Sequence, residues 1–208
     1  MKVINVDQNT PEWLRCRLGK ITGTRLKAIM GTKAARHTLL CELLAEEITG
    51  EFEEIYVSEA MKWGTVHEEP AIHVYEQVTG EKTDIVGFVQ NDDIPLVGLS
   101  PDRLIKKRGK YVKGVEVKCP SSKVAVKYRL ADEIPPEYKW QVVHYFLVCD
   151  TLKELDFVVY DPRIKEDRLK IWVKNVTREE LQGDIDEALE KLSGFIDELF
   201  IHKEELYT

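Results

Sequence analysis

Short stretches in the middle of the chain alternate hydrophobic and polar residues, which favours strands joined by polar turns. The expected strands are Ile85–Gln90, Leu96–Leu99, Arg103–Lys106, Tyr111–Lys118, Leu155–Tyr160 and Leu169–Lys174. In Tyr111–Lys118, side chains two apart point to the same face. Glu116 and Lys118 should therefore lie together, opposite Val115 and Val117.

Helical patterns flank these strands. Thr10-Pro11 is typical of an N-cap followed by proline at the first helical position, and Thr177 to Glu180 has the form of a capping box. The expected helices are Pro11–Arg17, a second running to Gly31, Leu39–Ile48, Ser58–Gly80 with Pro70 bending or dividing it, Val124–Leu130, Tyr138–Val148, and a last one from Thr177. This order predicts a mixed α/β fold.

The 208 residues suffice for one domain with a substantial core. We expect a helical part over 1–80, a sheet core with the active site over 81–175, and a C-terminal helix over 176–208. No run approaches the roughly 18 apolar residues of a membrane span, and the N-terminus has no apolar signal core. The expectation is a cytoplasmic protein without a membrane partner.

Cysteine and histidine spacing argues against a disulfide framework or a zinc site. The four cysteines are far apart and form no C-x-x-C pair: Cys16, Cys41, Cys119 and Cys149. His67 and His73 are not spaced for one helical face, and H-E-x-x-H is absent. The cysteine spacing also does not match the ligand set of an iron–sulfur cluster.

The net charge of −7 hides a segregation of charge along the chain. Residues 13–36 hold seven basic residues and no acidic one, and residues 103–139 hold eleven basic and four acidic residues. Residues 42–59 hold seven glutamates and no base, and residues 183–208 hold eight acids and two lysines. The blocks suggest a positive surface for a polyanion and a separate acidic one.

Asp102, Glu116 and Lys118 make a candidate metal-dependent active site. Taken alone, the pair Glu116 and Lys118 is most simply an exposed ion pair. Phosphodiester cleavage, however, calls for Mg²⁺, and Mg²⁺ takes one or two carboxylates as ligands. Asp102 and Glu116 would hold the metal together with the backbone carbonyl of Val117, and Lys118 would lie beside the attacking water.

Ser100-Pro101-Asp102 followed by Glu116-Val117-Lys118 resembles the PD-(D/E)XK nuclease signature. More specifically, the chain resembles lambda-type phage exonucleases, also called YqaJ-like viral recombinases. Five ordered blocks carry this resemblance: Trp13–Thr22 (W-x-x-x-R-L-G-x-I-T), Trp63–Glu68 (W-G-x-x-x-E), Glu116–Pro120 (E-x-K-C-P), Trp140–Tyr145 (near A-Q-V-Q-Y) and Tyr160–Arg163 (Y-D-P-R). Trp140 and His144 depart from the family pattern.

The resemblance implies a restriction-endonuclease-like core, with a mixed central sheet between helices, forming a single nuclease domain over 1–208. It also implies a 5′→3′ exonuclease that acts on double-stranded DNA ends and leaves 3′ single-stranded overhangs for recombination. Mg²⁺ would be the cofactor, with Mn²⁺ as a substitute. A homotrimeric ring around DNA would place the basic blocks inward and the acidic C-terminal helix outward. A single-strand annealing protein is a candidate partner, and a phage-encoded chain would act in the host cytoplasm.

The resemblance assigns further site residues. Glu68 would supply an additional carboxylate, and Arg17 would contact the 5′-phosphate of the DNA end. Thr24 and Ser100 would add hydroxyl donors to the same phosphate. Gln141 would either complete that pocket or hold the scissile phosphate. Asp92 and Asp93 compete for one alignment, so neither is assigned.

Two other functions remain open at this point. The same core serves endonucleases and resolvases, which would nick closed circles without needing a DNA end. A DNA-binding module with a decayed nuclease site is the alternative from another class. The presence of Asp102, Glu116 and Lys118 together argues against it.

Overall fold

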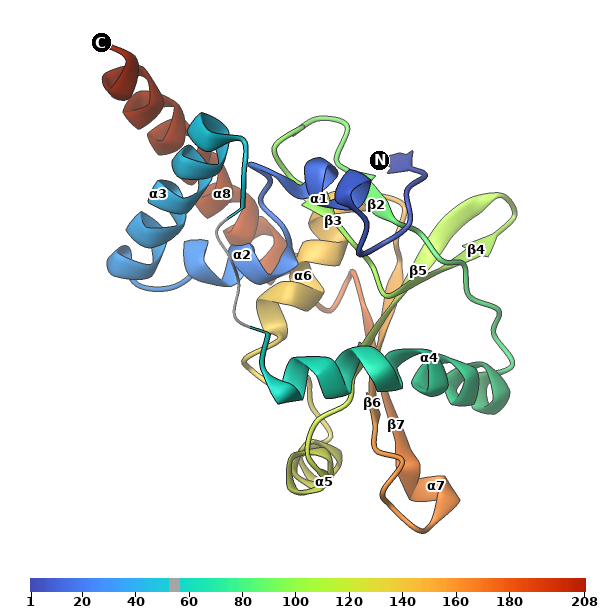
Figure 1. The fold of residues 1–208 in the computed structure, drawn as a ribbon. Helices are drawn as coiled ribbons and strands as arrows, with labels where there is room; N and C mark the ends of the chain where they lie inside the picture. The colour runs from blue at the N-terminus through green and yellow to red at the C-terminus, as the bar shows by residue number, and fades with distance from the viewer. Residues whose placement is uncertain (53–56) are drawn as a thin grey trace.

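The computed structural model describes residues 1–52 and 57–208, and its first half is mainly helical (Figure 1). The helices before the main sheet are α1 (Pro11–Arg17), α2 (Gly23–Ile29), α3 (Lys33–Thr49) and α4 (Glu59–Thr79). The side chain of Thr10 accepts a hydrogen bond from the amide of Trp13, as its N-cap pattern predicts. Helix α4 is continuous through Pro70, so that proline does not divide it.

The strands form two sheets. Three short antiparallel strands make the first, in the order β1 (Lys2–Ile4), β2 (Phe88–Gln90), β3 (Gly98–Leu99). The second has the order β4 (Arg103–Lys107), β5 (Lys110–Lys118), β6 (Glu154–Tyr160), β7 (Ile171–Thr177). Strands β5 and β6 are parallel and the other pairs are antiparallel, so the main sheet is mixed, as expected.

The sheet core differs from the expected single sheet at Pro101. Proline has no amide hydrogen to continue a ladder, and Ser100 to Asp102 separates β3 from β4. Strand β2 pairs with β3 on one side and with β1 on the other, apart from the main sheet.

The expected parts of the chain need two corrections. The stretch 1–80 is not purely helical, because Lys2–Ile4 forms β1 on the edge of β2. The last helix, α8 (Gln182–Tyr207), starts later than the capping box at Thr177. The reciprocal hydrogen bonds of that box do form between Thr177 and Glu180, but they close the turn that precedes the helix.

Helices cover both faces of the main sheet (Figure 1). The remaining helices are α5 (Ser122–Ala131), α6 (Lys139–Val148) and α7 (Asp167–Lys170). Helix α6 packs with α2, α8 and one face of β6 in the larger core. The C-terminal half of α4 packs on the other face, against residues of β5, β6 and β7. Within the described residues, no helix is long and apolar enough to cross a membrane.

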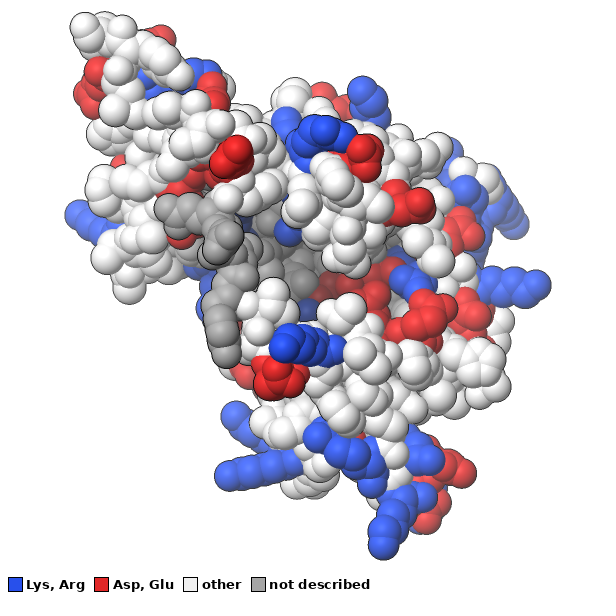
Figure 2. Space-filling view, in the orientation of Figure 1, with Lys and Arg blue, Asp and Glu red and all other residues white. Residues whose placement is uncertain are grey.

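The N-terminal basic block is not the free positive surface that its charge suggests. Arg25 pairs with Glu46 of the acidic block, and Arg36 pairs with Glu198 on α8. Part of that acidic block, Glu53 and Glu54, lies outside the described residues. Lysines and arginines gather instead over α5 and α7 (Figure 2).

Candidate active site

Strand β5 places Glu116 and Lys118 on the face that α6 covers. Val115 and Val117 point the other way, into the core beneath α4, as the alternation predicts. Gly114 precedes Glu116 on the α6 side, and a Cβ there would lie 2.8 Å from the ring of Tyr145. The absence of that Cβ lets Tyr145 approach the strand. Glu116 is 1% exposed, so the simple interpretation of an exposed ion pair is wrong.

Both oxygens of the Glu116 carboxylate are held by hydrogen bonds. Lys118 donates to Oε1, and the side-chain amide of Gln141 donates to the same oxygen over 2.5 Å. The hydroxyl of Tyr145 donates to Oε2 over 2.7 Å. A buried carboxylate needs such partners. This network fixes Glu116 in one orientation.

Asp102 lies between β3 and β4 and reaches across to β5. Its Oδ2 accepts a hydrogen bond from the amide of Val117 over 2.7 Å. Its own amide lies 3.2 Å from the hydroxyl of Tyr145, to which it donates. Burial, and then the negative charge of Glu116, raise the pKa of Asp102 well above its usual range.

Helix α4 brings a third carboxylate to this group. Burial raises the pKa of Glu68, while the nearby Arg103 opposes the shift and Glu116 adds to it. Arg103 is 6% exposed, lies 3.7 Å from the Glu68 carboxylate and pairs with Glu69. Figure 2 shows acidic side chains in the hollowed region above α4. The site thus concentrates negative charge.

Lys118 is a charged donor in this structure. Burial alone would lower its pKa, but the carboxylates of Glu116 and Asp102 outweigh burial and raise it above the ordinary value. A protonated ammonium can stabilise developing negative charge but cannot accept a proton from water. The structure therefore favours charge stabilisation as the role of Lys118.

The donor set fits a divalent cation. Within the described residues, no three histidine, cysteine or acidic side chains are arranged as a complete metal site. Asp102 and Glu116 supply two carboxylates, and each carboxylate oxygen can accept more than one contact. Burial first, and then the negative charge of Glu116, raise the pKa of Asp102, and a bound cation would oppose both effects by favouring the ionised carboxylate. The carbonyl of Val117 belongs to the backbone segment that Asp102 contacts.

Arg17 contacts Ser100, which precedes Asp102 by two residues along the chain. Its guanidinium donates to the Ser100 hydroxyl over 2.8 Å and lies 4.4 Å from the centre of the Trp13 ring. Burial and the neighbouring Arg25 lower the pKa of Arg17 to about 10. Within the described parts of the chain, no carboxylate lies within ion-pair distance of it. A half-buried cation with neutral partners is a fitting anion site.

Of the other residues considered from the sequence, one lies at the carboxylates and two do not. Gln141 contacts Glu116 and is therefore at the carboxylates. Thr24 is exposed on α2, and no hydrogen bond joins its side chain to Arg17 or Ser100 in the described structure. Asp92 binds the N-terminal ammonium at 2.5 Å, away from this site.

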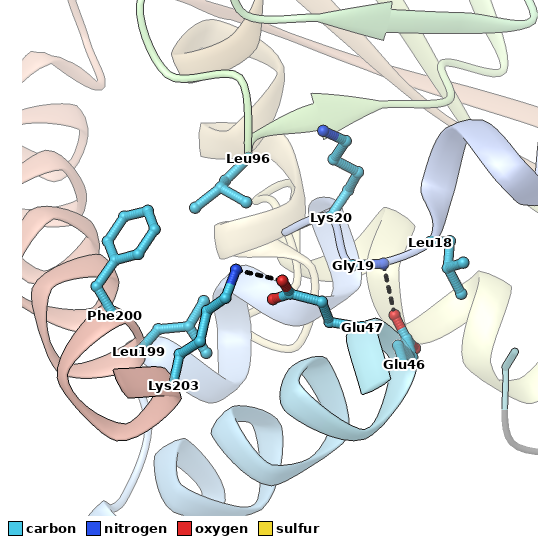
Figure 3. Close-up of a pocket in the computed structure, with 9 residues that line it drawn as sticks. All are labelled: Leu18, Gly19, Lys20, Glu46, Glu47, Leu96, Leu199, Phe200 and Lys203. Atoms are coloured by element: carbon cyan, nitrogen blue, oxygen red, sulfur yellow. Dashed lines mark hydrogen bonds and ion pairs between the residues drawn. The ribbon is translucent and has the colours of Figure 1, made fainter. Parts of the chain in front are cut away.

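A pocket of about 320 Å³ lies behind the loop that follows Arg17 (Figure 3). It does not include the candidate carboxylates. Its lining shows how the loop is anchored, because the amide of Gly19 donates to Glu46 over 2.8 Å. Glu46 also pairs with Arg25, whose guanidinium donates to the Lys20 carbonyl over 2.8 Å. These contacts anchor the loop that follows Arg17, and they lie outside the group of candidate carboxylates.

Sequence reasoning missed two residues of the site, Tyr145 and Arg103. Tyr145 lies four residues after Gln141, so both fall on one face of α6. That spacing was a usable signal once Gln141 had been assigned. Arg103 had a weaker signal: it is a charged residue that opens a strand otherwise buried at Leu104 and Ile105.

Three solved structures that the chain matches are described as exonucleases. The chain matches an alkaline exonuclease, LHK-Exo, from Laribacter hongkongensis at 30% identity and a TM-score of 0.86, covering 95% of this chain and 96% of that one. The complex of LHK-Exo with dAMP matches at 31% identity and a TM-score of 0.84, with the same coverage. A phage-related exonuclease from Haemophilus somnus 129PT shares the fold at 15% identity and a TM-score of 0.58, covering 88% of this chain and 96% of that one.

No curated protein matches the chain significantly. The fold is of the PD-(D/E)XK type, as the sequence predicted. The model of the YqaJ-like viral recombinase domain matches residues 12–151, which include all three carboxylates, Lys118, Arg17 and Gln141. The chain belongs to the YqaJ-like viral recombinase domain family.

Proposed function

We propose that this protein is a Mg²⁺-dependent exonuclease that digests double-stranded DNA from 5′ ends and leaves 3′ single-stranded overhangs for recombination. Mn²⁺ would substitute for Mg²⁺. The observation that carries the proposal is the contact between Arg17 and Ser100, two residues before Asp102. It joins a candidate phosphate-binding cation to the carboxylate network of a nuclease.

Each side chain has a distinct task in this proposal. Asp102 and Glu116, with the Val117 carbonyl, would hold the metal, which supplies charge neutralisation and an activated water. Glu68 adds a third carboxylate at the edge of the site. Lys118 donates to the scissile phosphate as its negative charge develops. Gln141 and Tyr145 keep the Glu116 carboxylate in place.

The proposed path of the DNA follows the lysine and arginine side chains that gather over α5 and α7. Lys123, Lys127 and Arg129 lie on α5, which begins four residues after Lys118. Figure 2 shows lysine and arginine side chains over α5 and α7. Such a surface attracts phosphates irrespective of sequence. We place the enzyme in the cytoplasm, with a single-strand annealing protein as its candidate partner.

Arg17→Ala should slow digestion of 5′-phosphorylated duplex by about ten- to a hundredfold, since a charge-assisted contact contributes about 1.5–3 kcal/mol. Digestion of 5′-hydroxyl duplex should hardly change, so the mutant would not distinguish the two ends. Arg15→Ala is the matched control, because Arg15 is exposed on the same helix and pairs with Glu12. A full wild-type preference for 5′-phosphate in Arg17→Ala would place the pocket elsewhere.

We also propose that the protein assembles as a homotrimer. Large apolar side chains are exposed on α8, with Phe200 51% exposed, Ile201 57%, Leu206 59% and Tyr207 68%. This helix would then contribute to contacts between copies rather than face outward. Sedimentation velocity at several concentrations should show a species of three chains. A single monomeric species throughout would reject the assembly.

Linear and closed-circular forms of one plasmid test the exonuclease proposal against the endonuclease alternative. With Mg²⁺, the linear form should be digested and the covalently closed circle should persist. Nicking of the closed circle at a similar rate would favour the endonuclease. Binding of linear DNA without any hydrolysis in Mg²⁺ or Mn²⁺ would favour the binding module.

A further inference from the structure

The half of α4 that carries Glu68 has little packing of its own. The buried residues of this helix are Ala71, Ile72 and Tyr75, all after Pro70. These three pack beneath the sheet in the smaller core, with side chains from β4 to β7. Among residues 59–69, all of which the structure describes, none is buried. The position of Glu68 therefore depends on side-chain contacts to other elements.

Arg163 makes one of these contacts and joins three segments. Its guanidinium carbon lies 4.4 Å from the centre of the Trp63 ring on α4. Its Nε donates to the Asp161 carboxylate over 2.6 Å, and Nη2 donates to the Pro120 carbonyl over 2.7 Å. Pro120 follows Lys118 by two residues, and Asp161 follows the last residue of β6. One side chain thus links α4 to the ends of both parallel strands.

Stacking rather than hydrogen bonding holds Trp63. Its indole nitrogen is buried and has no hydrogen-bond partner among the described residues. His67 stacks on the ring with centroids 3.7 Å apart, but His67 belongs to the same helix. Arg163 therefore supplies an attachment of Trp63 to the sheet, and a planar guanidinium suits such a stack.

Arg103 provides the other attachment, through its pairs with Glu68 and Glu69. The two arginines differ in what they fix. Arg103 contacts the carboxylates directly, whereas Arg163 acts one turn earlier on the helix and touches none of Glu68, Asp102 or Glu116. Loss of Arg163 would leave the charge around the carboxylates nearly intact but free the start of α4.

We propose that Arg163 is a positioning residue that, through Trp63, holds the first half of α4 and with it Glu68 against the end of β5 that carries Lys118. The role of Glu68 in this inference rests on the proposed function. A displacement of about 1 Å in an active site can lower the rate on the order of a hundredfold. A contact far from the scissile bond can thus control turnover.

The kinetic test is Arg163→Ala. We expect kcat on 5′-phosphorylated duplex to fall between about tenfold and a hundredfold, with KM changed less than about twofold. Arg15→Ala is the matched control, because the Arg15 side chain is 70% exposed and pairs only with Glu12 among the described residues. A loss confined to KM would overturn the proposal, since it would mark Arg163 as a DNA contact.

The double variant tests the route through Glu68. In a Glu68→Gln background, Arg163→Ala should lower kcat little further, because coupled residues are non-additive. Equal losses in both backgrounds would overturn the proposal. Wild-type kcat in Glu68→Gln alone would remove Glu68 from the proposed function. Whether Arg163 holds the first half of α4 would then be tested by a measurement that needs no enzymatic activity.

That measurement is amide hydrogen exchange of the metal-free protein. Arg163→Ala should lose protection over residues 59–69 while residues 71–79 and β6 keep theirs. A Trp63→Leu variant should reproduce the same local loss, whereas Arg15→Ala should not. Unchanged hydrogen exchange over residues 59–69 in Arg163→Ala would overturn the proposal that Arg163 holds this half of α4. Loss of protection across the whole chain would also overturn it, since Arg163 would then stabilise the fold generally.

Discussion

Asp102→Asn and Glu116→Gln are each expected to reduce DNA hydrolysis by roughly a thousandfold or more, equivalent to about 4 kcal/mol. Each change removes one negative charge from the carboxylate pair and so weakens metal binding. Both replacements preserve size, and the basic side chains over α5 are untouched. Affinity for duplex DNA should stay near wild type. The measurements are initial rates of digestion in Mg²⁺ and DNA binding in EDTA.

Glu81→Gln is the matched control for these variants. Glu81 pairs with Lys107, which lies at the end of the β4–β5 hairpin remote from Lys118. Its digestion rate should be that of the wild type. Near-normal hydrolysis by either Asp102→Asn or Glu116→Gln would exclude that residue as a metal ligand. A joint loss of hydrolysis and thermal stability would instead assign it to the fold.

Lys118→Ala should lower turnover by about a hundred- to a thousandfold, the usual cost of removing a preorganised donor to developing charge. The raised pKa of Lys118 gives the reason, since the residue is a cation at neutral pH and lies at the carboxylates. Metal affinity should not fall, because the change removes a positive charge. The measurements are single-turnover rates over a Mg²⁺ titration.

Lys110→Ala is the control on the same strand. Lys110 opens β5 at the opposite end and is exposed. A wild-type rate in Lys118→Ala would contradict the mechanism. A rate restored fully by higher Mg²⁺ would show that Lys118 helps assemble the metal site instead of stabilising the transition state.

The sequence predicted the part of the site that is local in the chain. Asp102, Glu116 and Lys118 fall within one hairpin, and strand alternation was enough to place the last two on one face. Tyr145 was missed because its contact with Glu116 spans 29 residues and depends on how closely α6 packs on Gly114. Such approach distances are set by tertiary packing.

The fold shows the same division between local and distant signals. The N-cap at Thr10 and the hairpin strands follow from short patterns. Helix α3 begins at Lys33, earlier than the predicted start at Leu39. The prediction missed the first turns because they are not buried and show no apolar period. Strand β1 pairs with a segment more than 80 residues away, so three residues alone give no evidence of it.

Digestion of a linear duplex labelled separately at its 5′ and 3′ termini tests the central claim most directly. With Mg²⁺, wild-type protein should release the 5′ label early and the 3′ label late, leaving 3′ single strands, and EDTA should stop both. Lys118→Ala should release neither label at a comparable rate. Early release of the 3′ label, or equal digestion in EDTA, would contradict a metal-dependent exonuclease that starts at 5′ ends.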